Sequence, residues 1–192
     1  MKIICRVIFL LAIFLEMSRA SAQPLSLFLD EEYGFQIEYP SYWLLNDNGL
    51  TSVNPFKVST PRNSVHDFQE YMKVTVLDDA ENTLEANFRE NMVFMKQNVP
   101  GFTVLKYGDA QIGRKHSIWA TYSYEVVKKK KPLLGMIPRT EKKIYVAKSY
   151  TILHENKVYI LTGTAEKDNF ERYEKMFDEM AQSFSFMVRD LV

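Results

Sequence analysis

The chain has 192 residues, of which 46% are hydrophobic, and it contains 13 Phe, 11 Tyr and 2 Trp. This is enough apolar material for the core of one domain of ordinary size, which excludes an intrinsically disordered chain. Its 24 basic and 24 acidic residues balance, which argues against nucleic-acid binding through a strongly basic surface.

The N-terminal residues have the pattern of a secretory signal peptide. Lys2 and Arg6 precede an unbroken apolar run over residues 7–15, and the small residues Ala20-Ser21-Ala22 follow. The run is shorter than the ~20 residues that a transmembrane helix needs. Residues 1–22 are therefore predicted to be a signal peptide that is cleaved before Gln23. This places residues 23–192, predicted as a single domain, in the periplasm or outside the cell.

The one cysteine, Cys5, lies inside this leader and precedes its apolar run. It cannot be the lipidated cysteine of a lipoprotein, which follows the apolar run. The mature chain is therefore predicted to have no disulfide, no lipid anchor and no thiol chemistry.

The first half of the mature chain contains two predicted strands and one predicted helix. Apolar residues alternate with polar ones over residues 35–39 and again over 72–76, which is typical of half-buried strands. Thr83 is a suitable N-cap for a helix that Pro100-Gly101 would end. The apolar stripe of this helix comprises Leu84, Phe88, Met92, Met95 and Val99.

Four more strands and a final helix follow. The strands are predicted over residues 102–106, 116–127, 142–154 and 157–165. Glu155-Asn156 is predicted to form the two-residue turn of a hairpin between the last two. Asp168 and Glu171 have the spacing of a capping box at the start of the helix. The apolar stripe of this helix comprises Phe170, Tyr173, Phe177, Met180 and Phe184.

Neighbouring strands joined by hairpins exclude a doubly wound parallel sheet. Each of the two amphipathic helices needs a sheet face to cover. The sequence therefore predicts an α+β fold, an α/β/α sandwich whose central, mainly antiparallel sheet is flanked by helices on both faces.

Several short motifs resemble those of the PsbP-like family. The opening Tyr33-Gly34-Phe35-x-Ile37-x-Tyr39-Pro40-x-x-Trp43 is similar to the first motif of that family. The closing Tyr159-x-Leu161 strand, with Ala165 and Ser183-Phe184 after it, resembles the family's ending. Thr83-Leu84 and Ile112-Gly113 lie between them in the expected order. The resemblance extends over nearly the whole mature chain, and its motifs consist of packing residues.

The resemblance implies an α/β/α sandwich around an antiparallel sheet. It also implies a non-enzymatic protein, because family members include a photosystem II extrinsic subunit, bacterial exported proteins and a Ran-binding relative. Such proteins act by docking onto other macromolecules.

The search for catalytic or metal-binding motifs also favours a non-enzymatic protein. His66, His116 and His154 lie far apart and lack the spacing of metal ligands. The chain has neither a glycine-rich phosphate loop nor a Gly-x-Ser-x-Gly elbow. No catalytic residue, metal or cofactor is predicted.

An aromatic cluster near the mature N-terminus has two interpretations. Tyr33, Tyr39, Tyr42 and Trp43 either close one edge of the core or line a partner groove, since Tyr and Trp are frequent interface anchors.

The segment 128–143, KKKKPLLGMIPRTEKK, is the strongest candidate for a binding element. It holds seven basic residues and one acidic residue, a net charge of +6, whereas the rest of the mature chain carries −8. Since it joins two long strands, it is predicted to be a hairpin excursion with an apolar tip. The predicted binding residues are Lys128, Lys129, Lys130, Lys131, Leu133, Leu134, Met136, Ile137 and Arg139.

Three interpretations of this segment remain open. The apolar tip folds back onto its own sheet, or it anchors an acidic protein partner, or it contacts an anionic membrane surface to which the flanking lysines are attracted. The sequence predicts an exported, non-enzymatic accessory protein that docks onto a protein complex of the cell envelope. The alternative is a peripheral protein that contacts membrane or lipid through residues 128–143.

Overall fold

The computed structural model describes residues 24–46, 51–62, 68–78, 83–129 and 140–187. The predicted signal peptide, Cys5 and the apolar tip of the basic segment lie outside these residues. The described chain forms two α-helices, one 3₁₀ turn and ten strands. These are β1 (Leu25–Asp30), β2 (Phe35–Pro40), β3 (Leu44–Leu45), β4 (Phe56–Ser59), β5 (Tyr71–Leu77), α2 (Leu84–Asn98), β6 (Thr103–Ile112), β7 (Lys115–Lys129), β8 (Thr140–His154), β9 (Lys157–Glu166), η2 (Lys167–Asn169), α3 (Phe170–Ser183) and β10 (Ser185–Phe186).

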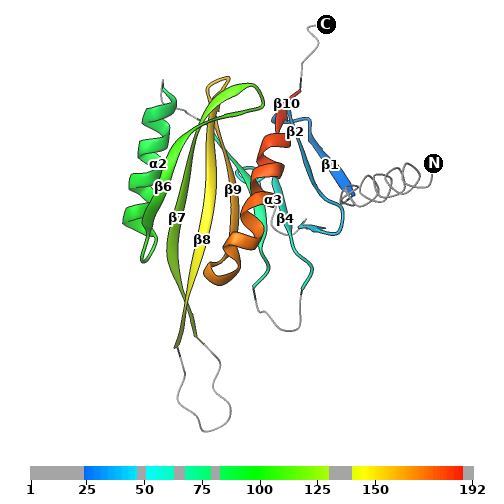
Figure 1. Cartoon of the computed structure of the whole chain (residues 1–192). Helices are drawn as coiled ribbons and strands as arrows, with labels where there is room; N and C mark the ends of the chain where they lie inside the picture. Colours follow the sequence, from blue (N-terminus) through cyan, green and yellow to red (C-terminus); the bar gives the residue numbers. More distant parts are fainter. Residues whose placement is uncertain (1–23, 47–50, 63–67, 79–82, 130–139, 188–192) are drawn as a thin grey trace, which may run out of the picture.

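Seven strands form one antiparallel sheet in the order β3-β4-β5-β9-β8-β7-β6 (Figure 1). The predicted hairpin between β8 and β9 is confirmed, because Glu155 and Asn156 at its turn both have positive φ. Gly113 and Arg114 adopt the same backbone conformation between β6 and β7. The mixed α+β class with a mainly antiparallel sheet is therefore confirmed.

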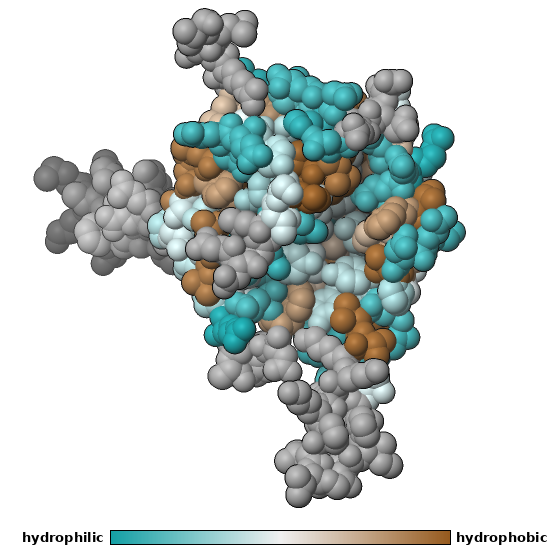
Figure 2. All heavy atoms as spheres, turned by 180° about the vertical axis from the view of Figure 1, so that it is seen from behind, coloured by the Kyte–Doolittle hydropathy of each residue, from teal (hydrophilic) through white to brown (hydrophobic). Residues whose placement is uncertain are grey.

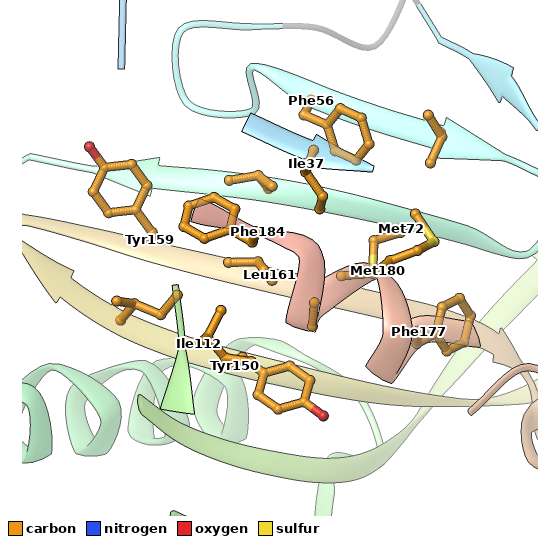
Figure 3. Close-up of a cluster of buried hydrophobic side chains, with 14 of the residues drawn as sticks. Ile37, Phe56, Met72, Ile112, Tyr150, Tyr159, Leu161, Phe177, Met180 and Phe184 are labelled. Atoms are coloured by element: carbon orange, nitrogen blue, oxygen red, sulfur yellow. The ribbon is translucent and has the colours of Figure 1, made fainter. Parts of the chain in front are cut away.

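The larger core lies between this sheet and α3. Phe177 of α3 packs so closely on β9 that a Cβ atom at Gly163 would overlap its ring. Figure 3 shows side chains of α3, β5, β8 and β9 converging in this core. The predicted stripe of the last helix is confirmed, since Phe170, Phe177 and Met180 are buried, as is Phe184, which follows the helix directly.

The smaller core cluster involves α2. Three of the predicted stripe residues, Phe88, Met92 and Met95, pack against Tyr122 of β7 and Ala147 of β8, among others. On β8 the larger core instead uses Val146, Tyr150 and Ile152. Because side chains alternate between the faces of a strand, α2 and α3 contact opposite sets of β8 residues. The predicted N-cap of α2 is confirmed, because Thr83 Oγ1 accepts a hydrogen bond from Ala86 N.

A second sheet, in the order β1-β2-β10, was not predicted. The predicted strand at residues 35–39 belongs to this sheet and not to the central one. Its residues Phe35 and Ile37 are completely buried in the larger core, where the ring of Phe35 stacks on Phe184. Burial against α3 and the central sheet therefore determined the position of β2.

The predicted capping box of the last helix is wrong. Asp168 lies in η2, and α3 begins after Asn169, whose side chain makes no capping hydrogen bond. The Asn169 amide instead donates to the buried carboxylate of Glu70, with 3.0 Å between Nδ2 and Oε1. A buried carboxylate without hydrogen-bond donors costs more free energy than an uncapped helix terminus, so the Asn169 amide pairs with Glu70.

Candidate functional site

The strands β7 and β8 extend beyond their neighbours as a two-stranded arm. Each has 15 residues, and they pair with each other as far as Lys129 and Thr140. Strand β6 pairs with β7 only up to Ser123, and β9 pairs with β8 only from Tyr145. Residues 124–129 and 140–144, hereafter the arm, therefore project from the sheet (Figure 1).

The predicted binding residues lie at and beyond the end of this arm. Lys128 and Lys129 are the last residues of β7. The others lie outside the described residues, namely Lys130, Lys131, Leu133, Leu134, Met136, Ile137 and Arg139. The structure thus places the strands that carry the basic segment, and the binding role of its residues stays a prediction.

Ion pairs hold the base of the arm. Lys142 Nζ lies 2.7 Å from Glu125 Oε1, and Lys143 Nζ lies 2.7 Å from Glu166 Oε1. The hydrogen bond with Glu166 raises the pKa of Lys143 above its ordinary value. Glu125 N also donates to Pro100 O, at 2.8 Å, in the turn after α2. These two lysines therefore have local carboxylate partners.

The arm also exposes apolar side chains. Val127 is 55% exposed and Ile144 is 41% exposed. In the register of the arm, Val127 lies opposite Lys142, and Ile144 lies opposite Glu125. Directly opposite residues point to the same face of a sheet, so the two apolar side chains flank the Lys142–Glu125 ion pair.

A cleft lies between α2 and the central sheet, and the sequence analysis did not predict it. Its volume is about 580 Å³. Figure 2 shows a hollow in the middle of the molecule seen from behind, where residues of intermediate hydropathy gather. We call it the α2 cleft, and its lining residues are Tyr71, Lys73, Thr75, Leu77, Asp78, Asn87, Glu90, Asn91, Phe94, Met95, Tyr122, Tyr124, Ala147, Val158, Ile160, Thr162 and Thr164.

Hydroxyl groups give the cleft much of its polar surface. Burial raises the pKa of Tyr122 to about 12, and it also raises the pKa of Tyr124. Both phenols are therefore neutral hydrogen-bonding groups at physiological pH. A signal for this site was present in β9, where Thr162 and Thr164 occupy one face of a central strand and Leu161 and Ala165 occupy the other. Threonines where aliphatic residues are expected indicate a face that no helix covers tightly.

The two histidines that the structure describes lie in separate surroundings. His116 pairs with Asp109 at 2.9 Å on the surface, and His154 packs its ring on Phe186 with 3.8 Å between the ring centroids. His66 lies outside the described residues. Over the described part of the chain, no group of three or more His, Cys, Asp or Glu side chains is arranged to hold a metal ion.

The aromatic cluster belongs largely to the core. Trp43 is buried and makes edge contacts with Tyr173 and Phe177 of α3. Tyr33 and Tyr39 pack against the same core, and only Tyr42 is exposed. The structure favours the first of the two interpretations of this cluster, closure of the core.

No protein-family model matches the sequence, and no curated protein matches it significantly. Several solved structures have a similar fold, including the following three. Cyanobacterial PsbP (CyanoP) of Synechocystis sp. PCC 6803 is 14% identical, with a TM-score of 0.56 over 88% of this chain and 95% of that one. LpqN of Mycobacterium tuberculosis, described as involved in cell envelope biogenesis, is 13% identical, with a TM-score of 0.53 over 88% of each chain. The Ran-binding protein Mog1p of Saccharomyces cerevisiae is 11% identical, with a TM-score of 0.56 over 86% of this chain and 96% of that one.

These likenesses confirm the PsbP-like resemblance at the level of the fold. Within the described ranges, no helix combines the length and the apolar character that crossing a bilayer requires.

Proposed function

We propose that this chain is an exported, non-enzymatic accessory protein that docks onto a protein complex of the cell envelope through the arm and the basic segment that it carries. Two proteins with a similar fold support a binding role, since one is described as Ran-binding and the other as involved in cell envelope biogenesis. The predicted signal peptide, cleaved before Gln23, supports export of residues 23–192.

The exposed arm is the observation that carries this proposal. Isolated two-stranded ribbons are marginally stable in water, and exposed apolar side chains make them a risk for aggregation. Val127 and Ile144 lie on one face of this ribbon, around an ion pair. A partner that covers this face would bury both side chains.

A protein surface fits the arm better than a membrane does. Anionic lipids attract free lysines, and Lys142 and Lys143 are already paired with carboxylates. Apolar side chains next to a balanced ion pair match the mixed composition of protein interfaces.

We infer further that the fold is the predicted α/β/α sandwich. The contacts of α2 and α3 with alternating residues of β8 support this inference. In such a sandwich the arm extends the middle layer beyond both helices and is accessible to a partner from either face.

The test replaces the apolar face of the arm without removing the arm. A photocrosslinking residue at position 127 would identify proteins that contact the arm in intact envelopes. The purified partner should then bind the parent protein and bind the double variant Val127→Ser/Ile144→Ser at least tenfold more weakly. A matched control is Leu29→Ser, because Leu29 is exposed to a similar extent on β1.

Two outcomes would contradict the proposal. Equal binding of the partner to the parent and the double variant would exclude the arm as the docking element. Binding to vesicles of anionic lipid that is lost in the double variant would replace the protein partner by a membrane surface.

A further inference from the structure

Two lysines lie side by side at the rim of the α2 cleft. Lys57 of β4 and Lys73 of β5 are direct cross-strand partners in the central sheet. The residues before and after Lys57, Phe56 and Val58, are buried in the larger core, as are the flanking residues of Lys73. Both lysine side chains therefore point to the other face, where Lys73 lines the cleft.

Neither lysine has a carboxylate partner among the residues that the structure describes. Lys73 Nζ donates to the neutral amide oxygen of Asn54, at 3.4 Å. Lys57 Nζ lies 4.7 Å from the centre of the Tyr71 ring, and Tyr71 lines the cleft. Like charges directly opposite each other destabilise an antiparallel pair, and no carboxylate among the described residues offsets this cost.

We propose that the α2 cleft binds an amphipathic organic anion whose carboxylate or phosphate lies between Lys57 and Lys73. An anion would remove the repulsion between the two ammonium groups and accept charge-assisted hydrogen bonds from both. The hydroxyl group of Thr162, which lies directly opposite Lys73 on β9, also lines the cleft and is a further donor for the oxygens of the anion.

The rest of the cleft specifies the body of the ligand. Its other lining includes aliphatic side chains from β5 and β9 and apolar side chains from α2, which are Leu77, Val158, Ile160, Phe94 and Met95. A volume of about 580 Å³ lies within the range of roughly 300–1,000 Å³ that is usual for small-molecule sites. The ligand is therefore a small anion with an apolar chain or ring and not an inorganic ion alone.

The two acidic residues of the lining do not neutralise the lysine pair. Asp78 forms an ion pair with Lys157. Glu90 lies on α2, which forms the wall opposite β5. Glu90 disfavours an anion placed close to it, so the anionic group is expected at the β4–β5 side of the cleft and the apolar body near α2.

Calorimetric titration of the full mature protein tests this site with three probes of equal chain length. Octanoate and octyl phosphate should both bind, and their relative affinities show which anionic group the site prefers. Octanol should bind at least about tenfold more weakly, because it lacks the charge that the lysines recognise. Octanol binding as tightly as octanoate, or no binding of any probe up to its solubility limit, would overturn the proposal.

Single substitutions test the position of the ligand. Lys73→Gln should weaken octanoate binding about tenfold, whereas Lys106→Gln, on the distant edge strand β6, should not change it. Glu90→Gln should strengthen binding. Phe94→Ala should weaken binding several-fold, while Val93→Ala, at the adjacent exposed position outside the lining, serves as its control.

The stability of the variants distinguishes a lost site from a damaged fold. Lys73→Gln removes a like-charge contact, so the ligand-free variant should be at least as stable as the parent in urea. Unchanged octanoate affinity in Lys73→Gln would overturn the proposal. The test is independent of the arm, because Val127→Ser/Ile144→Ser leaves the lining of the cleft intact.

Discussion

Replacing Asp178 by alanine probes the buried ammonium group of Lys148. This lysine is only 9% exposed, although it lies on a central strand. Its Nζ donates to Asp178 Oδ2 at 2.8 Å and to Glu174 Oε1 at 3.1 Å, both on α3. Tyr150 Oη donates to the second oxygen of Asp178, also at 2.8 Å. The substitution therefore removes one acceptor from the ammonium group and the acceptor of the Tyr150 hydroxyl.

The expected loss of stability follows from what is left unpaired. A hydrogen bond to a charged group contributes about 1.5–3 kcal/mol. Because Glu174 still accepts from Lys148, we expect Asp178→Ala to lower the free energy of unfolding by about 2 kcal/mol. Lys148→Met should cost less, about 1 kcal/mol, because the side chains of Glu174 and Asp178 are 41% and 36% exposed and can regain water. Lys148 Nζ also lies 5.2 Å from the centre of the Trp119 ring, and a methionine sulfur can make a favourable contact with the same ring.

These differences can be measured by urea unfolding of the parent, both single variants and the double variant, followed by circular dichroism. The free energies are comparable if the m-values of the variants equal that of the parent. The double variant should lose less than the sum of the two single losses, because no buried charge remains in it. The buried ammonium group of Lys148 should lose more when its partner is removed than the partly exposed carboxylate of Asp178 does. Equal losses of stability in Lys148→Met and Asp178→Ala would refute this reasoning.

Two further predictions concern packing and pH. Gly163→Ala should lower the free energy of unfolding by about 2 kcal/mol, because the added Cβ would overlap the Phe177 ring. The control Gly108→Ala places its Cβ 3.1 Å from Trp119 Nε1 and should cost less stability in the same urea assay. Burial first, and then Lys115, lower the pKa of His154 below 6.5, so the folded state binds fewer protons than the unfolded state. Stability should therefore rise as the pH increases towards about 6.5 and level off above it, and His154→Gln should reduce this rise. A pH dependence of unchanged size in His154→Gln would contradict the second prediction.

Local signals predicted much of the fold. Thr83 as an N-cap, Pro100-Gly101 as a stop and Glu155-Asn156 as a hairpin turn are each specified by backbone geometry within a few residues. The apolar stripe of the last helix was also correct, because helical periodicity shows which side chains share a face.

Long-range competition explains what the sequence analysis missed. Strand β2 alternates in the way that a strand of any sheet does, and only its contacts with β1, β10 and α3 place it in the second sheet. Strands β3 and β10 have two residues each, which is too short for a periodic pattern. Lys57 and Lys73 of the α2 cleft lie on separate strands. They are neighbours because of the register in which β4 pairs with β5, and the sequence spacing does not reveal this register.

The closing of the second sheet by β10 has a consequence for biosynthesis. Phe35 of β2 pairs with Phe186, and Met187 N donates to Gly34 O at 2.8 Å, so segments about 150 residues apart complete one unit. Synthesis proceeds from the N-terminus, and residues 25–40 lack their final partners until residues 170–187 have been made. During that interval the apolar side chains of β1 and β2 remain available to other binders, such as a holdase chaperone. Folding of the complete core is therefore expected only after residues 170–187 have been made.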